Sequence, residues 1–382
     1  MTTATPTQHA PINWLTAVVI ASTTLCSITI VPWYGLTHGY STAAWVLFVV
    51  FMGANGMAIT AGYHRLWSHR TYSAHWSIRI LLMIFGSMAL QNSILVWSSN
   101  HRTHHQHVDD NDKDPYSAKR GFWFSHVGWM LRNYPSSATD LSNVPDIKED
   151  PIAMFQHRYY LPLVLLTNFG ITLLAGWLVN DLWGVFWLAG MLRLVLSHNV
   201  TWFINSLAHW WGSRPYTDKN TARDNGVLAF LTYGEGYHNF HHLYASDYRN
   251  GVRWWQWDPT KWLIYSLSLV GLASNLRRMP DVSIQQARLA MQFQRLEQKL
   301  SCPKSAGRID IDKLRAQLTQ EAESFRKILA EWAKVRDEWY ADARQHIVRR
   351  WEKAQFRAHS REVLLRLRMQ HRRLALLNAQ FA

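Results

Sequence analysis

Eight of the 19 histidines fall into three short boxes whose spacing suits metal binding. The boxes are His64-Arg-Leu-Trp-Ser-His69, His101-Arg-Thr-His104-His105 and His238-Asn-Phe-His241-His242. Positions i, i+3 and i+4 share one face of a helix, so each HxxHH box can aim its three imidazoles at one point. Five residues of a regular α-helix turn about 500°. One of His64 and His69 should therefore lie at or beyond a helix end.

A metal centre explains why so many imidazoles gather. Buried unpaired histidines are costly and protonated ones repel each other, and a bound cation removes both problems. Neutral imidazole suits Fe, Zn, Cu and Ni, and eight ligands exceed the needs of one ion, so the boxes predict two metal ions. Histidines that only cap helices or line a polar surface would explain one such box, but explain three poorly. Spacing alone does not distinguish the metals.

Four apolar stretches are long enough to position these boxes at a membrane. Each has about 20 residues, the length of a spanning helix, and they cover about residues 14–34, 42–61, 160–179 and 183–204. Arg193 is their only charged residue. The joints within each pair lack Lys and Arg, whereas basic residues follow the second and fourth stretches. The positive-inside rule then predicts two hairpins with external turns, and cytoplasmic termini and histidines. Met1 to Asn13 lacks the basic start of a signal peptide, so the first stretch should be retained.

A fifth apolar run, residues 78–96, separates the first box from the second. If it crossed the bilayer, His64 and His69 would lie on the opposite side from His101. We therefore expect it to lie along the interface as an amphipathic segment. The predicted organisation is a membrane domain over residues 1–280, with a cytoplasmic helical cap at 62–159 and 205–280 that holds the two metals. Residues 281–382 form a helical C-terminal extension.

In this order and between these apolar runs, the boxes resemble the membrane-bound acyl-lipid and acyl-CoA desaturases, in particular the stearoyl-CoA (Δ9) type. Asn205-Ser-Leu-Ala-His209 and Gly234-Glu-Gly-Tyr-His238 extend the likeness, which covers about residues 12–278. It implies an all-α integral membrane fold and a di-iron centre with His209 as a ninth ligand. Asn205 would hold a metal-bound water, and four residues apart on one helix it would face the same way as His209. The resemblance also implies that a substrate tunnel is shaped by Gln91, Trp97 and Thr201.

The implied activity is an O2-dependent desaturation that places a cis double bond, of Δ9 type, in a saturated long-chain acyl group. No side-chain base can take protons from an unactivated CH2–CH2 pair, which favours iron over zinc as the working metal, although a purified protein could carry zinc. The animal enzymes have Arg-Asp before the second box, where this chain has Ser99-Asn100. The head group is therefore open among acyl-CoA, acyl carrier protein and glycerolipid. Without flavin, nicotinamide, haem or iron–sulfur fingerprints, electrons should come from a ferredoxin or cytochrome b5 type of donor.

Two other functions compete with this interpretation. A di-iron lipid or alkane hydroxylase would use the same metals, and a histidine-lined metal transporter would place its ligands within the spans, near the midplane. The sequence contains one Glu-x-x-His spacing, from Glu235 to His238. Glu235 could orient a ligating imidazole or serve as a structural acid. The cluster Asp109, Asp110, Asp112 and Asp114 is expected to be a solvated turn.

The C-terminal extension carries most of the excess charge. Residues 281–382 hold 21 Lys and Arg against 12 Asp and Glu, out of a net charge of +14 for the chain. Apolar residues from Leu314 to Trp339 recur every 3, 4 or 7 positions and predict a long amphipathic helix between Leu314 and Ile347, or a coiled coil. The segment from Arg344 to Arg373 could rest on anionic lipid or an acidic electron donor, or form a packing or oligomerisation helix. No nucleic-acid recognition motif accompanies the charge. Cys26 and Cys302 are too few to indicate a disulfide framework or a zinc ribbon.

Overall fold

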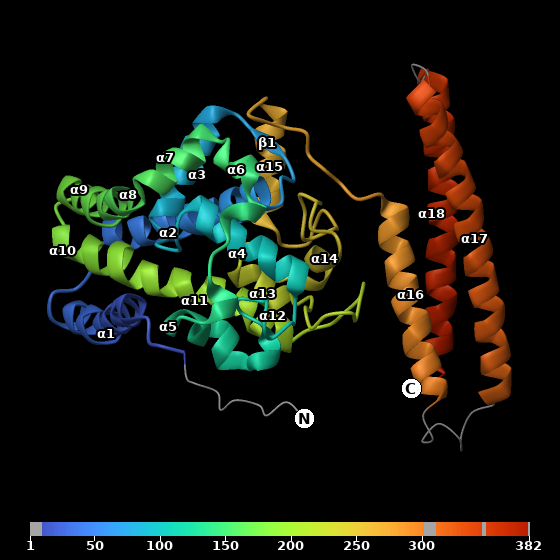
Figure 1. The fold of residues 1–382 in the computed structure, drawn as a ribbon, viewed down its shortest axis with the longest axis horizontal. Helices are drawn as coiled ribbons and strands as arrows, with labels where there is room; N and C mark the ends of the chain where they lie inside the picture. The colour runs from blue at the N-terminus through green and yellow to red at the C-terminus, as the bar shows by residue number, and fades with distance from the viewer. Residues whose placement is uncertain (1–9, 302–310, 346–348, 381–382) are drawn as a thin grey trace. The chain divides into compact units, whose positions relative to one another are not determined.

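The computed structural model describes residues 10–301, 311–345 and 349–380. These residues are mainly helical (Figure 1), and their only sheet pairs β1 (Ser73–Ala74) with β2 (Ala273–Ser274). The chain divides into two compact units, one of residues up to 213 with 219–278, and one of 214–218 with residues from 279 onward. Cys302, Ile347 and the first nine residues of the predicted cytoplasmic N-terminus lie outside the described residues.

Three helices of the first unit are long and apolar enough to cross a membrane. They are α1 (Trp14–Thr37), the continuous helix formed by α2 (Thr42–Met57) with the π-helical η1 (Ala58–Ser68), and the helix formed by α8 (Tyr160–Leu165), η6 (Leu166–Ile171) and α9 (Thr172–Leu178). Only 11% of the most apolar part of α1 is buried inside the protein, as expected of a helix whose solvent is lipid. The chain is thus built as a membrane protein.

The fourth predicted span is helical but more polar than the other three. It comprises α10 (Leu182–Val185), η7 (Phe186–Leu192) and α11 (Arg193–Asn205). Arg193 is fully buried and donates hydrogen bonds to the carbonyl oxygens of Met88 and Ala189 and to Asn168 Oδ1. These bonds satisfy a charge that would otherwise be costly among apolar helices. That residues 183–204 cross the bilayer remains a prediction.

The two hairpin turns meet at one end of the helix bundle. The Ser41 hydroxyl accepts from the N–H of Ala44 and so caps α2, and the Asp181 carboxylate accepts from the N–H of Gly184 and caps α10. Ser41 Oγ also donates to Asp181 Oδ2, at 2.5 Å. His64 lies 23 residues farther along the second helix, about 35 Å away at 1.5 Å per residue. The turns and the first histidine box are therefore at opposite ends of that helix.

The remaining helices of the first unit are short, and that they form a cytoplasmic cap over the histidines stays a prediction. The fifth apolar run is split between α3 (Trp76–Ser87) and the start of α4 (Ile94–His107), and neither is long enough to cross a bilayer. Both pack against η1 around buried Tyr63, Leu95 and Ile264. The other elements are η2 (Ala118–Arg120), η3 (Phe124–Gly128), α5 (Trp129–Leu131), η4 (Pro135–Ser137), η5 (Leu141–Asn143), α6 (Pro145–Lys148), α7 (Pro151–Arg158), α12 (Leu207–Trp210), α13 (Gly226–Leu231), α14 (His238–Leu243) and α15 (Pro259–Leu269).

The second unit is a bundle of three helices, α16 (Asp281–Leu300), α17 (Ile311–Gln345) and α18 (Arg350–Ala379). They lie side by side in Figure 1, and each packs against the other two. The apolar positions predicted for a long amphipathic helix lie on α17, and Leu318, Ile328 and Trp332 are buried against α16 and α18. The amphipathic helix is thus confirmed, and its apolar face is covered within the chain. Oligomerisation through this unit stays a prediction.

Candidate metal centre

Nine histidines converge in two groups within the first unit. His64, His69, His101, His105 and His241 form one group, which we call the five-histidine group. His104, His209, His238 and His242 form the other, the four-histidine group. Within each group, one ring nitrogen of every member lies within 4.8 Å of those of the others. All nine residues singled out in the sequence are therefore brought together, although His209 and the three boxes are far apart along the chain.

Each HxxHH box contributes to both groups, so the single point at which helix geometry could aim its three imidazoles is not what the structure shows. In α4, His101 and His105 belong to the five-histidine group and His104 to the four-histidine group. In α14, His238 and His242 belong to the four-histidine group and His241 to the five-histidine group. Positions i and i+4 are only about 40° apart around a helix, whereas i+3 and i+4 are about 100° apart. The two boxes consequently bridge the groups.

The first box sits where the second membrane helix ends in π-helical turns. His64 lies within η1, and His69 is the residue that ends it. The N–H of His69 donates to the carbonyl oxygen of His64, five residues back, which is the π-helical pattern. This wider turn brings the two rings together, with centroids 4.9 Å apart. The HxxxxH spacing thus matches a π-helical turn, as well as the predicted position at a helix end.

Asn205 and His209 do not lie on one continuous helix, contrary to the expectation from their spacing. Helix α11 ends at Asn205 and α12 begins at Leu207. Between them Ser206 donates its hydroxyl to the carbonyl oxygen of Trp202 and lies 3.0 Å from His126 Nδ1. His209 joins the four-histidine group, whereas Asn205 lines the adjoining pocket and makes no hydrogen bond to a histidine of the described chain.

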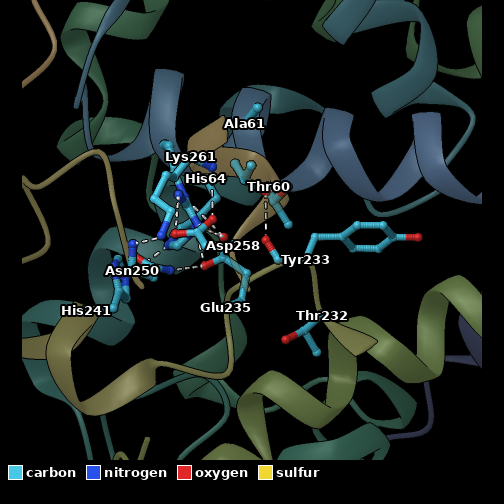
Figure 2. Close-up of polar contacts among 12 residues, drawn as sticks. Thr60, Ala61, His64, Thr232, Tyr233, Glu235, His241, Asn250, Asp258 and Lys261 are labelled. Carbon is cyan, nitrogen blue, oxygen red and sulfur yellow. Dashed lines mark hydrogen bonds and ion pairs between the residues drawn. The ribbon is translucent and has the colours of Figure 1, made fainter. Parts of the chain in front are cut away.

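Glu235 fixes the orientation of His64 (Figure 2). Its carboxylate lies 2.8 Å from His64 Nδ1 and also accepts hydrogen bonds from Arg65 and Asn250. Asp258 lies 3.0 Å from Arg65 on the other side and balances the buried charges. Glu235 can reach this position because glycines flank it. Gly234 has φ +103°, and a Cβ there would lie 2.5 Å from Asp258, while a Cβ at Gly236 would lie 2.2 Å from the nitrogen of Ala229.

Two aspartates play the same part for the four-histidine group. Asp114 Oδ1 lies 2.9 Å from His104 Nδ1 and accepts from the N–H of Tyr116, and its other oxygen accepts from the N–H of Asp109. Asp109 accepts from the hydroxyl of Thr221, which lies 2.8 Å from His209 Nδ1. Asp109 and Asp114 are buried. The expectation of a solvated turn is therefore wrong for these two, because the turn closes on itself and directs both carboxylates inward.

These contacts determine which ring nitrogen of three histidines carries the proton. An ionised carboxylate only accepts hydrogen bonds, so His64 and His104 must donate from Nδ1. The Thr221 hydroxyl gives its proton to Asp109 and can only accept from His209 Nδ1. Nε2 of all three is then a bare lone pair directed into its group. His64 Nε2 lies 3.0 Å from His241 Nε2, and His209 Nε2 lies 3.2 Å from His238 Nε2. Converging lone pairs at these distances fit a bound cation.

The electrostatics favour neutral imidazoles and ionised carboxylates. Burial, reinforced by the neighbouring rings, lowers the pKa of six histidines well below the ordinary value: His69, His101, His105, His238, His241 and His242. Burial lowers the pKa of His209 to about 3. Burial alone would raise the pKa of Glu235 and of Asp114, but His64 with Arg65, and His104 with two backbone N–H groups, hold them below their ordinary values. Neutral imidazole is the form that binds metal.

A pocket of about 860 Å³ reaches the five-histidine group. It is lined by apolar residues of α1 and by Gln91, Trp97 and Thr201, the three residues that the family resemblance implies shape a tunnel. Gln91 Nε2 donates to Thr201 Oγ1 at 3.0 Å, and Trp97 stacks on His101 with ring centroids 4.8 Å apart. Asn100, one of the two residues that depart from the animal pattern, also lines this pocket.

The role of Thr221 beside His209 was not predicted from the sequence, because no motif around Thr221 indicates a functional residue.

The fatty acid desaturase family model matches residues 40–267, which include all nine histidines. The chain belongs to the fatty acid desaturase family. This desaturase-family chain is 41% identical over 295 residues to acyl-CoA desaturase 1 of Saccharomyces cerevisiae, covering 76% of the chain and 57% of the yeast protein. It is 43% identical over 276 residues to a probable acyl-CoA desaturase of Schizosaccharomyces pombe, covering 72% and 56%.

The likeness to an animal relative covers more of that protein. The desaturase-family chain is 40% identical over 265 residues to the stearoyl-CoA desaturase of Bos taurus, covering 68% of the chain and 72% of the bovine protein. It spans a little over half the length of the two yeast relatives. The resemblance inferred from the histidine boxes is thereby confirmed at the level of the family.

Proposed function

We propose that the chain is an O2-dependent membrane fatty acyl desaturase that introduces a cis double bond at the Δ9 position of a saturated long-chain acyl group. The observation that carries the proposal is the pair of histidine groups, one of which contributes His64 and His101 to the lining of a largely apolar pocket, within a chain of the desaturase family. The pocket volume falls within the range of about 300–1,000 Å³ typical of small-molecule sites. The relatives named above are acyl-CoA and stearoyl-CoA desaturases.

The two histidine groups would hold two iron ions, one in each. The five-histidine group offers five imidazoles, and the four-histidine group offers four, with a water held by Asn205 as the fifth ligand we propose. Bound iron would supply the activation of O2 that removal of hydrogen from an unactivated carbon requires. Glu235, Asp114 and Thr221 would keep the ligand nitrogens deprotonated and correctly aimed. Zinc would fit the same nitrogens in a purified protein.

The pocket would hold the acyl chain against the five-histidine group. Each buried CH2 contributes about 0.8 kcal/mol, so an enclosed apolar pocket fixes both the affinity and the register of a long chain. The Gln91–Thr201 hydrogen bond joins two segments 110 residues apart across the pocket. Together with Trp97, it would set which carbon–carbon bond faces the histidines. Register is then the property that decides the position of the double bond.

The overall reaction removes two hydrogen atoms from the acyl chain and reduces O2 to two water molecules. Two further electrons must come from outside, from a donor of the ferredoxin or cytochrome b5 type, and two protons from the surrounding water. We propose acyl-CoA as the substrate on the strength of the relatives' names, with acyl carrier protein and glycerolipid as the competing head groups because Ser99-Asn100 departs from the animal pattern. We further propose four spans, with both termini and the histidines on the cytoplasmic side.

Expression in a host that lacks its own desaturase, followed by gas chromatography of its fatty acids, tests the proposal. A new Δ9 monoene should accumulate with the unaltered chain and be absent with His104→Ala. His107→Ala is the matched control, because His107 is on the same helix but belongs to neither histidine group, and it should retain activity. Hydroxy fatty acids, or no new product when a competent electron donor is present, would contradict the proposal.

A further inference from the structure

Helix α18 carries a row of arginines on its outer side. Arg350, Arg357, Arg361, Arg368 and Arg372 follow each other at steps of 7, 4, 7 and 4 residues, so they occupy an arc of about 60°. All five are exposed, and no hydrogen bond or ion pair joins any of them to another residue of the described chain. We call them the arginine row. It extends over 22 residues, or about 33 Å of helix.

The arginine row is not needed to hold the bundle together. The arginines of α18 that face α17 are different residues: Arg366 lies 2.5 Å from Glu331, and Arg373 lies 2.6 Å from Glu321. The opposite face of α18 supplies the buried side chains, including Val363, Leu367 and Leu374. The bundle therefore uses two sides of α18 and leaves the side with the arginine row in solvent.

A row of exposed apolar side chains runs beside the arginines. Trp351, Leu365, Met369 and Leu376 are spaced by 14, 4 and 7 residues and share an arc of about 40°. Their exposed fractions are 60%, 58%, 50% and 69%. One acidic residue, Glu362, lies on this side of the helix. In all, α18 has eight Lys and Arg against two Asp and Glu.

We propose that this side of α18 docks on an anionic lipid surface, with the arginine row against phosphate groups and the apolar row among the headgroups. Basic residues bind anionic membrane surfaces, and adjacent apolar side chains insert at the boundary between headgroups and acyl chains. Trp is enriched at the membrane–water interface. A straight row of about 33 Å suits an extended charged surface better than the small patch of a compact acidic protein. The candidate spans of the same chain ensure that a bilayer is present.

A fluorescent label on the apolar row tests the docking in the full-length protein. Cys26 and Cys302 are replaced by Ser, Leu365→Cys carries the label, and the protein is placed in nanodiscs whose lipids bear a headgroup quencher. Quenching should be at least about threefold stronger with phosphatidylglycerol present than with phosphatidylcholine alone, and high salt should reduce it. A label at Ala330→Cys, exposed on α17, should show no such difference.

Charge-matched variants separate the arginine row from net charge. Replacing the five arginines by Gln should abolish the extra quenching, whereas replacing Lys313, Arg315, Arg326, Lys327 and Lys334 of α17 by Gln should preserve it. Helical content and thermal unfolding establish that both variants fold, since all ten side chains are exposed. Equal quenching in both lipids, or none in either, overturns the proposal. A label that responds only to an added acidic soluble protein overturns it too, by assigning the surface to a protein partner.

Discussion

Replacing Glu235 by Gln should weaken metal binding at the five-histidine group without removing any ligand. The carboxylate lies within hydrogen-bond distance of four nitrogens from three residues, His64, Arg65 and Asn250, with Arg65 contributing two of them. A glutamine of the same shape has one acceptor oxygen and one NH2, so at least one of these donors would face another donor. If the NH2 faces His64, the ring loses the contact that keeps its proton on Nδ1. Its Nε2 is then no longer reliably a bare ligand.

The size of the effect follows from the buried charges around Arg65. Removing one partner of a buried ion pair costs about 3–5 kcal/mol. Asp258 remains 3.0 Å from Arg65 in the variant, so we expect a loss near the lower end, about 3 kcal/mol of unfolding free energy. Loss of the group that orients a ligating histidine typically lowers metal affinity about 10- to 100-fold. Stability and affinity should thus both fall, for separate reasons.

A chelator titration followed by metal analysis measures the affinity, and thermal unfolding of the metal-free protein measures the stability. Asp247→Asn is the matched control, because Asp247 is equally buried, pairs with Arg249 at 2.8 Å and belongs to neither histidine group. It should lose similar stability and keep its metal. Glu235→Gln should release one of the two metal equivalents that we propose at a lower chelator concentration than the parent. Equal retention in Glu235→Gln and the parent would refute the reasoning, as would equal loss in Asp247→Asn.

Two further predictions concern the four-histidine group. Thr221→Val keeps the shape of the side chain but deletes the acceptor for His209 Nδ1, so it should lower metal affinity about 10- to 100-fold. Thr221→Ser keeps the hydroxyl and should preserve the affinity. Equal metal affinity of the two variants in the same chelator titration would contradict this prediction. Lowering the pH should destabilise the metal-free protein, because His209, with a pKa of about 3 when folded, stays neutral while the unfolded residue takes up a proton below about pH 6.5. Protonation of unfolded His209 alone should then lower the unfolding free energy by about 2 kcal/mol at pH 5. Thermal unfolding that is unchanged between pH 7 and pH 5 would refute this prediction.

The local features of the site could be predicted from the sequence, whereas the features that depend on distant contacts could not. Each histidine box is a short stretch of sequence. The helix geometry that keeps His64 and His69 off one face of a regular helix also depends only on neighbouring residues. How His104 and His105 divide between two groups depends on what faces α4 from α12, α14 and η1, so their spacing does not decide it. Asp114 looks like a turn residue in the sequence. Its burial follows only from the way the turn folds back onto His104.

The same distinction applies to the fold. Four apolar stretches could be located because about 20 residues are needed to cross a bilayer. The hydrogen-bond partners of Arg193 could not be predicted, because Asn168 and the carbonyl oxygen of Met88 come from distant segments. In the second unit, the periodicity of α17 predicts an apolar face. It does not indicate that α16 and α18 cover that face.

The distribution of the histidines along the chain has a consequence for the order of folding. His64 meets His241 across 177 residues, and each group draws its members from at least three separate segments. Contacts at such separations form late, because the entropy of closing large loops must be lost before they contribute. Neither group exists until both halves of the first unit have come together. Neither complete set of ligands can therefore assemble from one local segment, and any metal binding there depends on the tertiary fold of the first unit.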